Sequence, residues 1–203
     1  MTSKLLSLDL STTCTGWSTF DLETKELLNY GILKPKVKGI TKLIYPERQL
    51  RVGVNLSLQI LELIMQEKPT KIVIEEINRH KNRMAGKTLD ILHGFVWQAI
   101  DTVNMLPYVT YMDSDGTSGW RSRKCLNLIM SDADRLHNKE AKKLNKKLDR
   151  GQKIPIITKK HLAQRYVNAK YGTTFDVDKV KTDADVCDSI GLGHAFLHMY
   201  IGL

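Results

Sequence analysis

The N-terminal part of the chain alternates short apolar runs with polar turn residues, a pattern typical of β-strands. The runs cover residues 4–10, 15–21 and 27–33, and Gly16 and the polar residues 21–25 supply turn chemistry. Because the connections between the runs are short, neighbouring runs are expected to pair in opposite directions. The pattern therefore predicts an antiparallel meander of three strands.

The next segment changes to the three- and four-residue spacing of an amphipathic helix. The helix is expected between Pro46 and Pro69, and its apolar positions are Leu50, Val54, Leu58, Leu61 and Met65. Consecutive apolar, β-branched residues then follow at positions 72–74, which indicates a strand that is covered on both faces. The sequence thus places a long helix between the meander and a central strand.

The remaining elements complete an α/β domain. A second amphipathic helix fits residues 87–103, a fifth strand fits residues 108–112, another helix starts at Lys159 and runs toward Tyr171, and a last helix starts near Thr182. This order predicts a mixed five-stranded sheet flanked by helices. With 203 residues, of which 42% are hydrophobic, the chain fits one domain over residues 1–203 that builds its own core.

Cysteine usage and hydropathy argue against secreted and membrane proteins. Cys14, Cys125 and Cys187 lie far apart and form no C-x-x-C pair, so neither a disulfide framework nor a zinc site is expected. No apolar stretch reaches the roughly 20 residues that a membrane span requires. We therefore expect a soluble protein of a reducing cytoplasm.

Positive charge is concentrated in one segment. The chain carries a net charge of +9, and residues 121–153 hold eleven basic and four acidic residues, so eleven minus four places +7 there. A thin apolar stripe of Ala141, Leu144 and Leu148 runs through this segment, which predicts a basic helical insertion over about residues 121–155. We expect the insertion to contact nucleic acid, with a solvated helix face as the alternative.

Four carboxylates lie where apolar elements begin or end. Asp9 and Glu75 each end an apolar strand, and Asp185 and Asp188 open the last helix. An acid in such a position is costly unless it is compensated, and several acids together are commonly compensated by a divalent cation. An acidic cluster in a basic protein therefore predicts a metal-dependent enzyme that acts on a polyanion.

The strand acids also have simpler explanations. Asp9 could accept hydrogen bonds from the Ser/Thr-rich turn at residues 11–15 that follows it. Side chains alternate along a strand, so only one of Glu75 and Glu76 can point toward Asp9. Spacing alone does not choose between the two glutamates.

The helix acids differ in how well a simple explanation fits them. Asp185 follows Thr182 at the start of the helix, where an acid stabilises the helix dipole. Asp188 is harder to explain in this way, because it lies one turn further along the same face. Gly191 and Ala195 continue that face with little bulk, and they are expected to let the helix approach the sheet closely.

Taken together, several motifs resemble RuvC-type Holliday junction resolvases of the ribonuclease H and integrase superfamily. The matching blocks are Leu8-Asp9-Leu10-Ser11 with Thr15-Gly16-Trp17, Ile74-Glu75-Glu76-Ile77 with Lys81-Asn82, and Asp183-Ala184-Asp185-Val186-Cys187-Asp188-Ser189-Ile190 with His194-Ala195. The resemblance implies a ribonuclease H-like fold and a homodimer that nicks two strands symmetrically across a four-way junction. It also implies that the catalytic, metal-binding acids are Asp9, Glu75, Asp185 and Asp188.

Further expectations follow from this resemblance. Hard oxygen ligands suit Mg²⁺ or Mn²⁺ as the cofactor. The substrate is expected to be branched DNA, either four-way junctions or replication forks. The basic insertion makes the chain look more like a bacteriophage member than a cellular enzyme, which would place it in the cytoplasm of a bacterial host.

One loop departs from the family pattern. Bacterial members tend to carry an aromatic residue three positions after the strand glutamate, where this chain has Asn78. Arg79, Lys81 and Arg83 follow and are expected to contact DNA phosphates, so strong base preference is not expected at the cleavage site. Trp120 is a candidate stacking residue, with burial in the core as the alternative.

The other candidate DNA contacts come from the insertion and from the helix after it. Two of them, Lys159 and Lys160, could orient a phosphate or neutralise developing charge, or could simply be solvated. The expected contacts outside the Asn78 loop are Arg121, Lys142, Lys143, Lys146, Lys147, Lys159 and Lys160.

Three other interpretations remain. His194 and His198 are four residues apart and could share a metal, although packed histidines fit their apolar neighbours better. The stretch of residues 9–13 is similar to the phosphate loop of actin-like ATPases and sugar kinases, yet 203 residues hold only one such domain and contain no second glycine-rich phosphate loop. A branched-DNA-binding protein without catalysis is the third, and the presence of all four acids argues against it.

Overall fold

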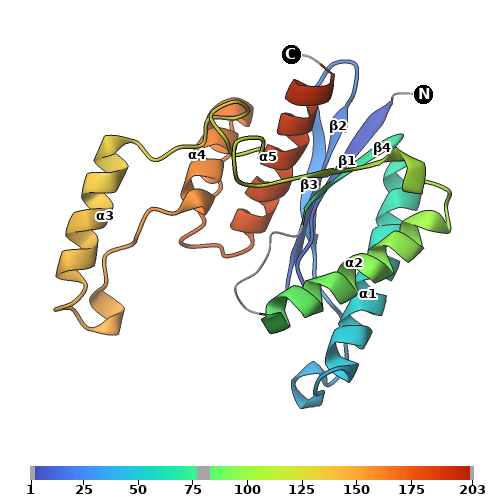
Figure 1. Cartoon of the computed structure of the whole chain (residues 1–203), viewed down its shortest axis with the longest axis horizontal. Helices are drawn as coiled ribbons and strands as arrows, with labels where there is room; N and C mark the ends of the chain where they lie inside the picture. The colour runs from blue at the N-terminus through green and yellow to red at the C-terminus, as the bar shows by residue number, and fades with distance from the viewer. Residues whose placement is uncertain (1–2, 77–82, 202–203) are drawn as a thin grey trace.

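A computed structural model of the chain describes residues 3–76 and 83–201, apart from the side chains of residues 83 and 85. Its centre is a five-stranded sheet in the order β3-β2-β1-β4-β5; Figure 1 labels β1 to β4. The strands are β1 (Lys4–Asp9), β2 (Thr15–Asp21), β3 (Leu27–Leu33), β4 (Lys71–Glu75) and β5 (Val109–Met112). The first three pair antiparallel, whereas β4 runs parallel to both β1 and β5. The predicted mixed sheet is confirmed.

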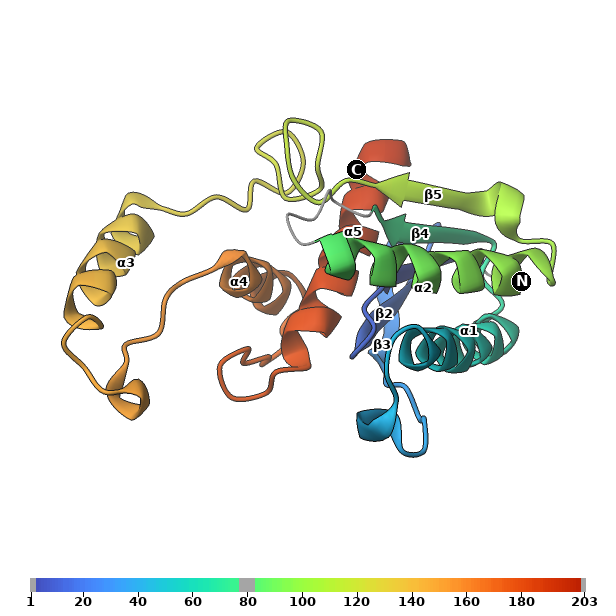
Figure 2. The same ribbon diagram turned by 60° about the horizontal axis from the view of Figure 1, so that its bottom comes forward.

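Two helices, α1 (Glu47–Glu67) and α2 (Arg83–Asp101), cover one face of the sheet (Figure 2). Alternation along the strands directs one set of side chains to this face, including Leu6, Leu8, Ile72 and Ile74. These side chains pack against buried apolar residues of α1 and α2. The helix expected between Pro46 and Pro69 is confirmed. Its buried face is formed by Val52, Leu56, Ile60 and Ile64, whereas four of the five apolar positions expected from the sequence are exposed.

The opposite face is covered by α5 (Asp183–Tyr200), which packs against α4 (Lys159–Tyr171). The hydroxyls of Ser7 and Ser18 donate hydrogen bonds of 2.8 and 3.0 Å to the carbonyl oxygen of Ser189. A Cβ on Gly193 would lie 2.3 Å from the Phe20 ring, so this helix needs small residues where it meets the sheet.

One of the two small residues that the sequence placed against the sheet has a different neighbour. Gly191 was expected to face the sheet, but a Cβ there would meet the ring of Trp120 at 2.6 Å. The contact with the strands comes from Ser189 and Gly193. Close approach was predicted correctly, because several small residues share the helix, but the rotation of the helix depends on packing that a single sequence does not record.

The basic insertion extends from the main body as an arm (Figure 1). Its helix α3 spans Asp132–Leu144, which is shorter than the predicted insertion of residues 121–155. Irregular chain flanks it on both sides, together with a 3-10 turn at Arg150–Gln152. Two further 3-10 turns, Ile40–Lys42 and Leu106–Tyr108, lie in connections of the main body. None of the helices in the described part of the chain is long and apolar enough to cross a membrane.

Candidate active site

Two of the predicted acids, Asp9 and Glu75, lie side by side at the ends of adjacent strands. β1 and β4 are parallel neighbours in which Leu8 lies opposite Ile74, so Asp9 and Glu75 end adjacent strands at the same level. Both continue the strand positions that face α5, whereas Glu76 is exposed. Register and alternation together therefore select Glu75 rather than Glu76 as the neighbour of Asp9, a choice that spacing left open.

The other two acids come from the start of α5, and a glycine allows them to approach. Gly16 pairs with Asp9 across β1 and β2, and a Cβ on Gly16 would lie 1.9 Å from the carbonyl oxygen of Asp185. Only a residue without a side chain lets the first turn of α5 rest on β2 at this point. The close contact brings Asp185 and Asp188 to the ends of β1 and β4. Asp183 makes a different contact, since its Oδ2 accepts a hydrogen bond from the amide of Asp176 (2.8 Å).

An arginine lies among these acids. The Nη2 atom of Arg121 is 2.9 Å from Oδ1 of Asp188 and 3.6 Å from Oε2 of Glu75. Its guanidinium lies 4.0 Å from the centre of the Trp120 ring, and the indole of Trp120 donates a 3.0 Å hydrogen bond to the same Glu75 oxygen. Trp120 and Arg121 therefore form one wall of the acid cluster.

The positions of Trp120 and Arg121 correct two expectations from the sequence. Trp120 is fully buried, so it belongs to the core and does not stack on bases, as its alternative interpretation stated. Arg121 was expected among the exposed DNA contacts, but only 12% of its side chain is accessible and it points toward the acids. The basic composition of residues 121–153 concealed this difference, since sequence alone does not show which of its many cations turns inward.

Burial and mutual repulsion perturb the acids strongly. Burial first, and then the carboxylates of Asp188, Glu75 and Asp185, raise the pKa of Asp9 well above its ordinary value. Burial also raises the pKa values of Glu75 and Asp188, although the charge of Arg121 acts in the opposite direction on both. The cluster therefore holds more negative charge than its protein neighbours compensate.

Lysine residues of α4 meet the rim of the cluster. Nζ of Lys160 lies 3.4 Å from Oδ1 of Asp185, so this lysine borders the acid cluster. Lys159 instead pairs with Asp115 at 2.6 Å. Lys160 thus pairs with an acid of the cluster, whereas Lys159 pairs with an acid outside it.

The donor chemistry fits a divalent cation such as Mg²⁺. All four candidate ligands offer carboxylate oxygens, and Oδ1 of buried Asp188 accepts no hydrogen bond of good geometry although a guanidinium nitrogen lies 2.9 Å away. As the side chains stand, however, the described residues contain no group of three or more His, Cys, Asp or Glu arranged to hold an ion. The site thus offers oxygen donors of the kind that Mg²⁺ prefers, with Arg121 between two of the acids.

The histidine alternative is not supported by the contacts of α5. Nδ1 of His194 lies 2.6 Å from the hydroxyl oxygen of Tyr171, and the ring also packs edge-on against Tyr166. Burial lowers the pKa of His194 to about 4, which keeps the imidazole neutral at physiological pH. His194 is therefore a packed core residue.

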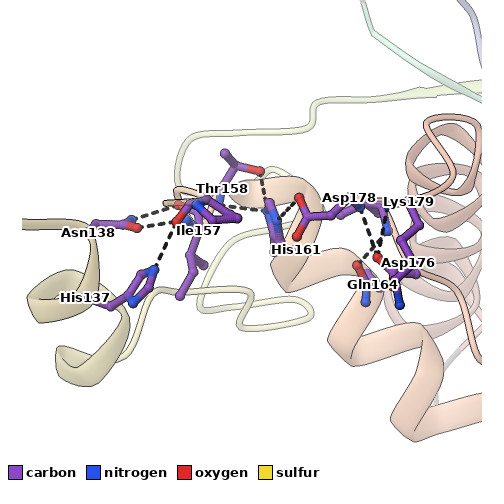
Figure 3. Close-up of polar contacts among 11 residues, drawn as sticks. His137, Asn138, Ile157, Thr158, His161, Gln164, Asp176, Asp178 and Lys179 are labelled. Atoms are coloured by element: carbon purple, nitrogen blue, oxygen red, sulfur yellow. Dashed lines mark hydrogen bonds and ion pairs between the residues drawn. The ribbon is translucent and has the colours of Figure 1, made fainter. Parts of the chain in front are cut away.

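The arm is attached to the main body by a series of side-chain contacts (Figure 3). On α3, Asn138 donates to the carbonyl of Ile157 and accepts from its amide, both at 2.8 Å. Asn145, the residue directly after α3, makes the same pair of bonds with Ile154 at 2.9 and 2.7 Å. The contacts continue through Thr158 to His161 of α4, which approaches Asp178 within 3.1 Å. These contacts hold an extended segment along α3 and give the arm a defined structure.

The asparagine face of α3 points toward this segment, and basic residues occupy exposed positions of the arm. The exposed residues include the four lysines predicted to bind DNA, namely Lys142, Lys143, Lys146 and Lys147. Arg79 and Lys81 lie outside the described residues, as does the side chain of Arg83. The arm thus offers a basic surface that the protein itself does not cover.

The fold is similar to solved structures of Holliday junction resolvases. Thermus thermophilus RuvC is similar over 98% of this chain and 96% of its own, with 12% identity and a TM-score of 0.55. T. thermophilus RuvC in complex with a Holliday junction substrate matches over the same fractions, with 11% identity and a TM-score of 0.54. The yeast mitochondrial Holliday junction resolvase Ydc2 matches 97% of this chain and 78% of its own, with 16% identity and a TM-score of 0.49.

The two RuvC structures confirm the fold that the motifs predicted: the chain has the RuvC-like form of the ribonuclease H fold. No protein-family model matches the sequence, and a comparison with curated proteins finds no match. The resemblance is therefore one of tertiary structure and of a few short motifs.

Proposed function

We propose that this protein is a metal-dependent endonuclease that nicks branched DNA, with Mg²⁺ or Mn²⁺ as its cofactor. The observation that carries the proposal is the meeting of Asp9, Glu75, Asp185 and Asp188 at the ends of β1 and β4, on a RuvC-like fold. Their excess negative charge suits a divalent cation, and the net charge of +9 suits a polyanionic substrate.

Each residue of the site has a distinct contribution in this proposal. The four carboxylates would hold the cation, which when bound lowers the pKa of an attacking water and stabilises the leaving 3′ oxygen of a phosphodiester. Trp120 orients Glu75 through its indole hydrogen bond. Lys160 lies on the rim beside Asp185, where its ammonium group can bind an oxygen of the scissile phosphate.

The basic arm favours a substrate that is a nucleic acid extending well beyond the phosphodiester at the acid cluster. Its exposed lysines extend the positive surface away from the acid cluster, and phosphate contacts of this kind position DNA without reading its bases. T. thermophilus RuvC, whose structure is similar over nearly the whole chain, has been solved with a Holliday junction substrate. We therefore propose four-way junctions or forks as the substrate and selection by DNA shape.

We further propose that the active form is a homodimer. α1 exposes apolar side chains at helical spacing, namely Leu50, Val54, Leu58 and Met65, each between 43 and 63% accessible. A hollow of about 400 Å³ lies between this stripe and residues 36–38. A second copy that covers the stripe would bury it in a symmetric interface and would supply a second nicking site.

A nicking assay tests the function directly. A mobile four-way junction, a fork and a linear duplex are each incubated with Mg²⁺, with Ca²⁺ or without metal. We expect Mg²⁺-dependent nicks near the branch point, and we expect Asp9→Asn and Glu75→Gln to abolish them while DNA binding persists. Glu76→Gln is the matched control, because it removes the neighbouring, exposed charge and should keep activity. A wild-type chain that binds junctions but nicks none with any cation would instead be a non-catalytic binding protein.

A further inference from the structure

Arg121 lies within the acid cluster, although not all of its hydrogen-bonding groups are satisfied there. The chain around it is fixed, since Trp120 donates its amide to the carbonyl of Asp113 (2.8 Å) and Arg121 donates its amide to the carbonyl of Ser114 (3.2 Å). The guanidinium, in contrast, is imperfectly satisfied. Its buried Nε atom has no hydrogen-bond partner in the described residues, and buried donors of folded proteins are nearly always paired.

The charges of the site explain why the positively charged side chain of Arg121 lies among the acids. Four carboxylates face two basic side chains, Arg121 and Lys160, so four minus two leaves two uncompensated negative charges when all four acids are ionised. One divalent cation would neutralise this excess with both basic groups in place. Two divalent cations would match the four carboxylates alone, and Arg121 would then lie among ligands that no longer need its charge.

The geometry makes Arg121 and a divalent cation compete even when only one cation binds. A cation held by Glu75 and Asp188 needs the oxygens that Arg121 now approaches at 3.6 and 2.9 Å. We propose that Arg121 is a built-in counter-cation, which stabilises the acid cluster of the metal-free protein and must withdraw before a divalent cation binds Glu75 and Asp188. This inference rests on the proposed function, because it assumes that the cluster is a metal site.

A counter-charge such as that of Arg121 stabilises a fold in which four acids lie close together. Without a counter-charge, buried carboxylates repel one another and destabilise the fold. Arg121 relieves part of that repulsion in the absence of metal, and a divalent cation relieves more of it. Metal and Arg121 therefore compete for the same oxygens, so removal of the guanidinium should strengthen metal binding.

Direct measurement of Mn²⁺ binding tests the competition without any cleavage. Mn²⁺ is titrated into the wild-type chain, Arg121→Met and Arg123→Met in the absence of DNA, and free Mn²⁺ is followed by electron paramagnetic resonance. Methionine keeps the flexible, unbranched stem of the side chain, removes the guanidinium and offers no hard ligand. Loss of the competing unit charge should lower the dissociation constant of Arg121→Met by about tenfold or more. Arg123 is exposed and is the matched control for loss of one positive charge, so its variant should bind as the wild type does.

A second measurement uses the wild-type side chain itself, in case Arg121→Met folds poorly. The Nε–H resonance of Arg121 is identified by its loss in Arg121→Lys, and it is followed by NMR while Mg²⁺ is added. Withdrawal from the cluster should move this buried proton into rapid exchange with water, in parallel with metal binding. A resonance that stays protected at saturating Mg²⁺ would overturn the proposal.

The outcomes separate this inference from the proposed function. Equal Mn²⁺ affinity in the wild type and Arg121→Met, with both folded, would refute competition by Arg121 and leave the metal-dependent nuclease intact. If no variant binds Mn²⁺ or Mg²⁺, both the inference and the metal-dependent chemistry are wrong. Tighter binding by Arg121→Met alone supports the competition.

Discussion

Replacement of Gly16 by alanine should disrupt the candidate active site through backbone displacement alone. The new Cβ would lie 1.9 Å from the carbonyl oxygen of Asp185, 2.4 Å from its carbonyl carbon and 3.1 Å from the amide nitrogen of Val186. All three atoms belong to the backbone of α5, so no side chain can rotate away. Ordinary contact begins at 3.4 Å, and 3.4 minus 1.9 means that β2 and α5 must separate by about 1.5 Å.

This displacement sets the size of the expected effects. Overpacking of a well-packed contact typically costs about 1–3 kcal/mol of unfolding free energy. The same shift moves Asp185 away from Asp9, and a misplacement of about 1 Å commonly lowers a catalytic rate by about 100-fold. We therefore expect Gly16→Ala to remain folded, to lose stability in that range and to nick branched DNA roughly two orders of magnitude more slowly.

Urea unfolding and single-turnover nicking of a four-way junction measure the two effects. Gly94→Ala in α2 is the control, because a Cβ there meets nothing within 4 Å. An alanine in this helix should raise stability by about 0.5–1 kcal/mol and leave nicking unchanged. If Gly16→Ala matches the wild type in both stability and rate, the close approach of α5 to β2 is not what positions the acids.

Two further predictions concern charge. Replacing the four arm lysines together by glutamine should weaken binding to every DNA form and flatten the slope of log affinity against log salt, by about 0.9 for each lost phosphate contact; an unchanged slope would make the arm a solvated surface. The second concerns pH. Burial and neighbouring carboxylates raise the pKa values of Asp9, Glu75 and Asp188, so the folded chain holds more protons than the unfolded chain between the ordinary carboxyl pKa and these raised values. Metal-free stability should therefore fall as pH rises through that window, less steeply in Asp9→Asn, as urea unfolding in the presence of a chelator would reveal.

The sequence by itself determined the elements and the identity of the candidate acids. Strand alternation and helical spacing are local properties, so the five strands, the helices α1, α2 and α4, and the start of α5 could be predicted to within a few residues. The helix α3 was located only within a longer insertion. The positions of Asp9 and Glu75 at the ends of apolar strands, and of Asp185 and Asp188 one helical turn apart, follow from the same local periodicity.

Only the tertiary structure decided which groups meet. The parallel register of β1 and β4 selects Glu75 over Glu76, and the approach of β2 to α5 gives Gly16 its role. Arg121 turns inward because Glu75 and Asp188, both far from it along the chain, surround it with negative charge. Such contacts join segments that are distant in sequence, and no local pattern of hydrophobic and polar residues encodes them.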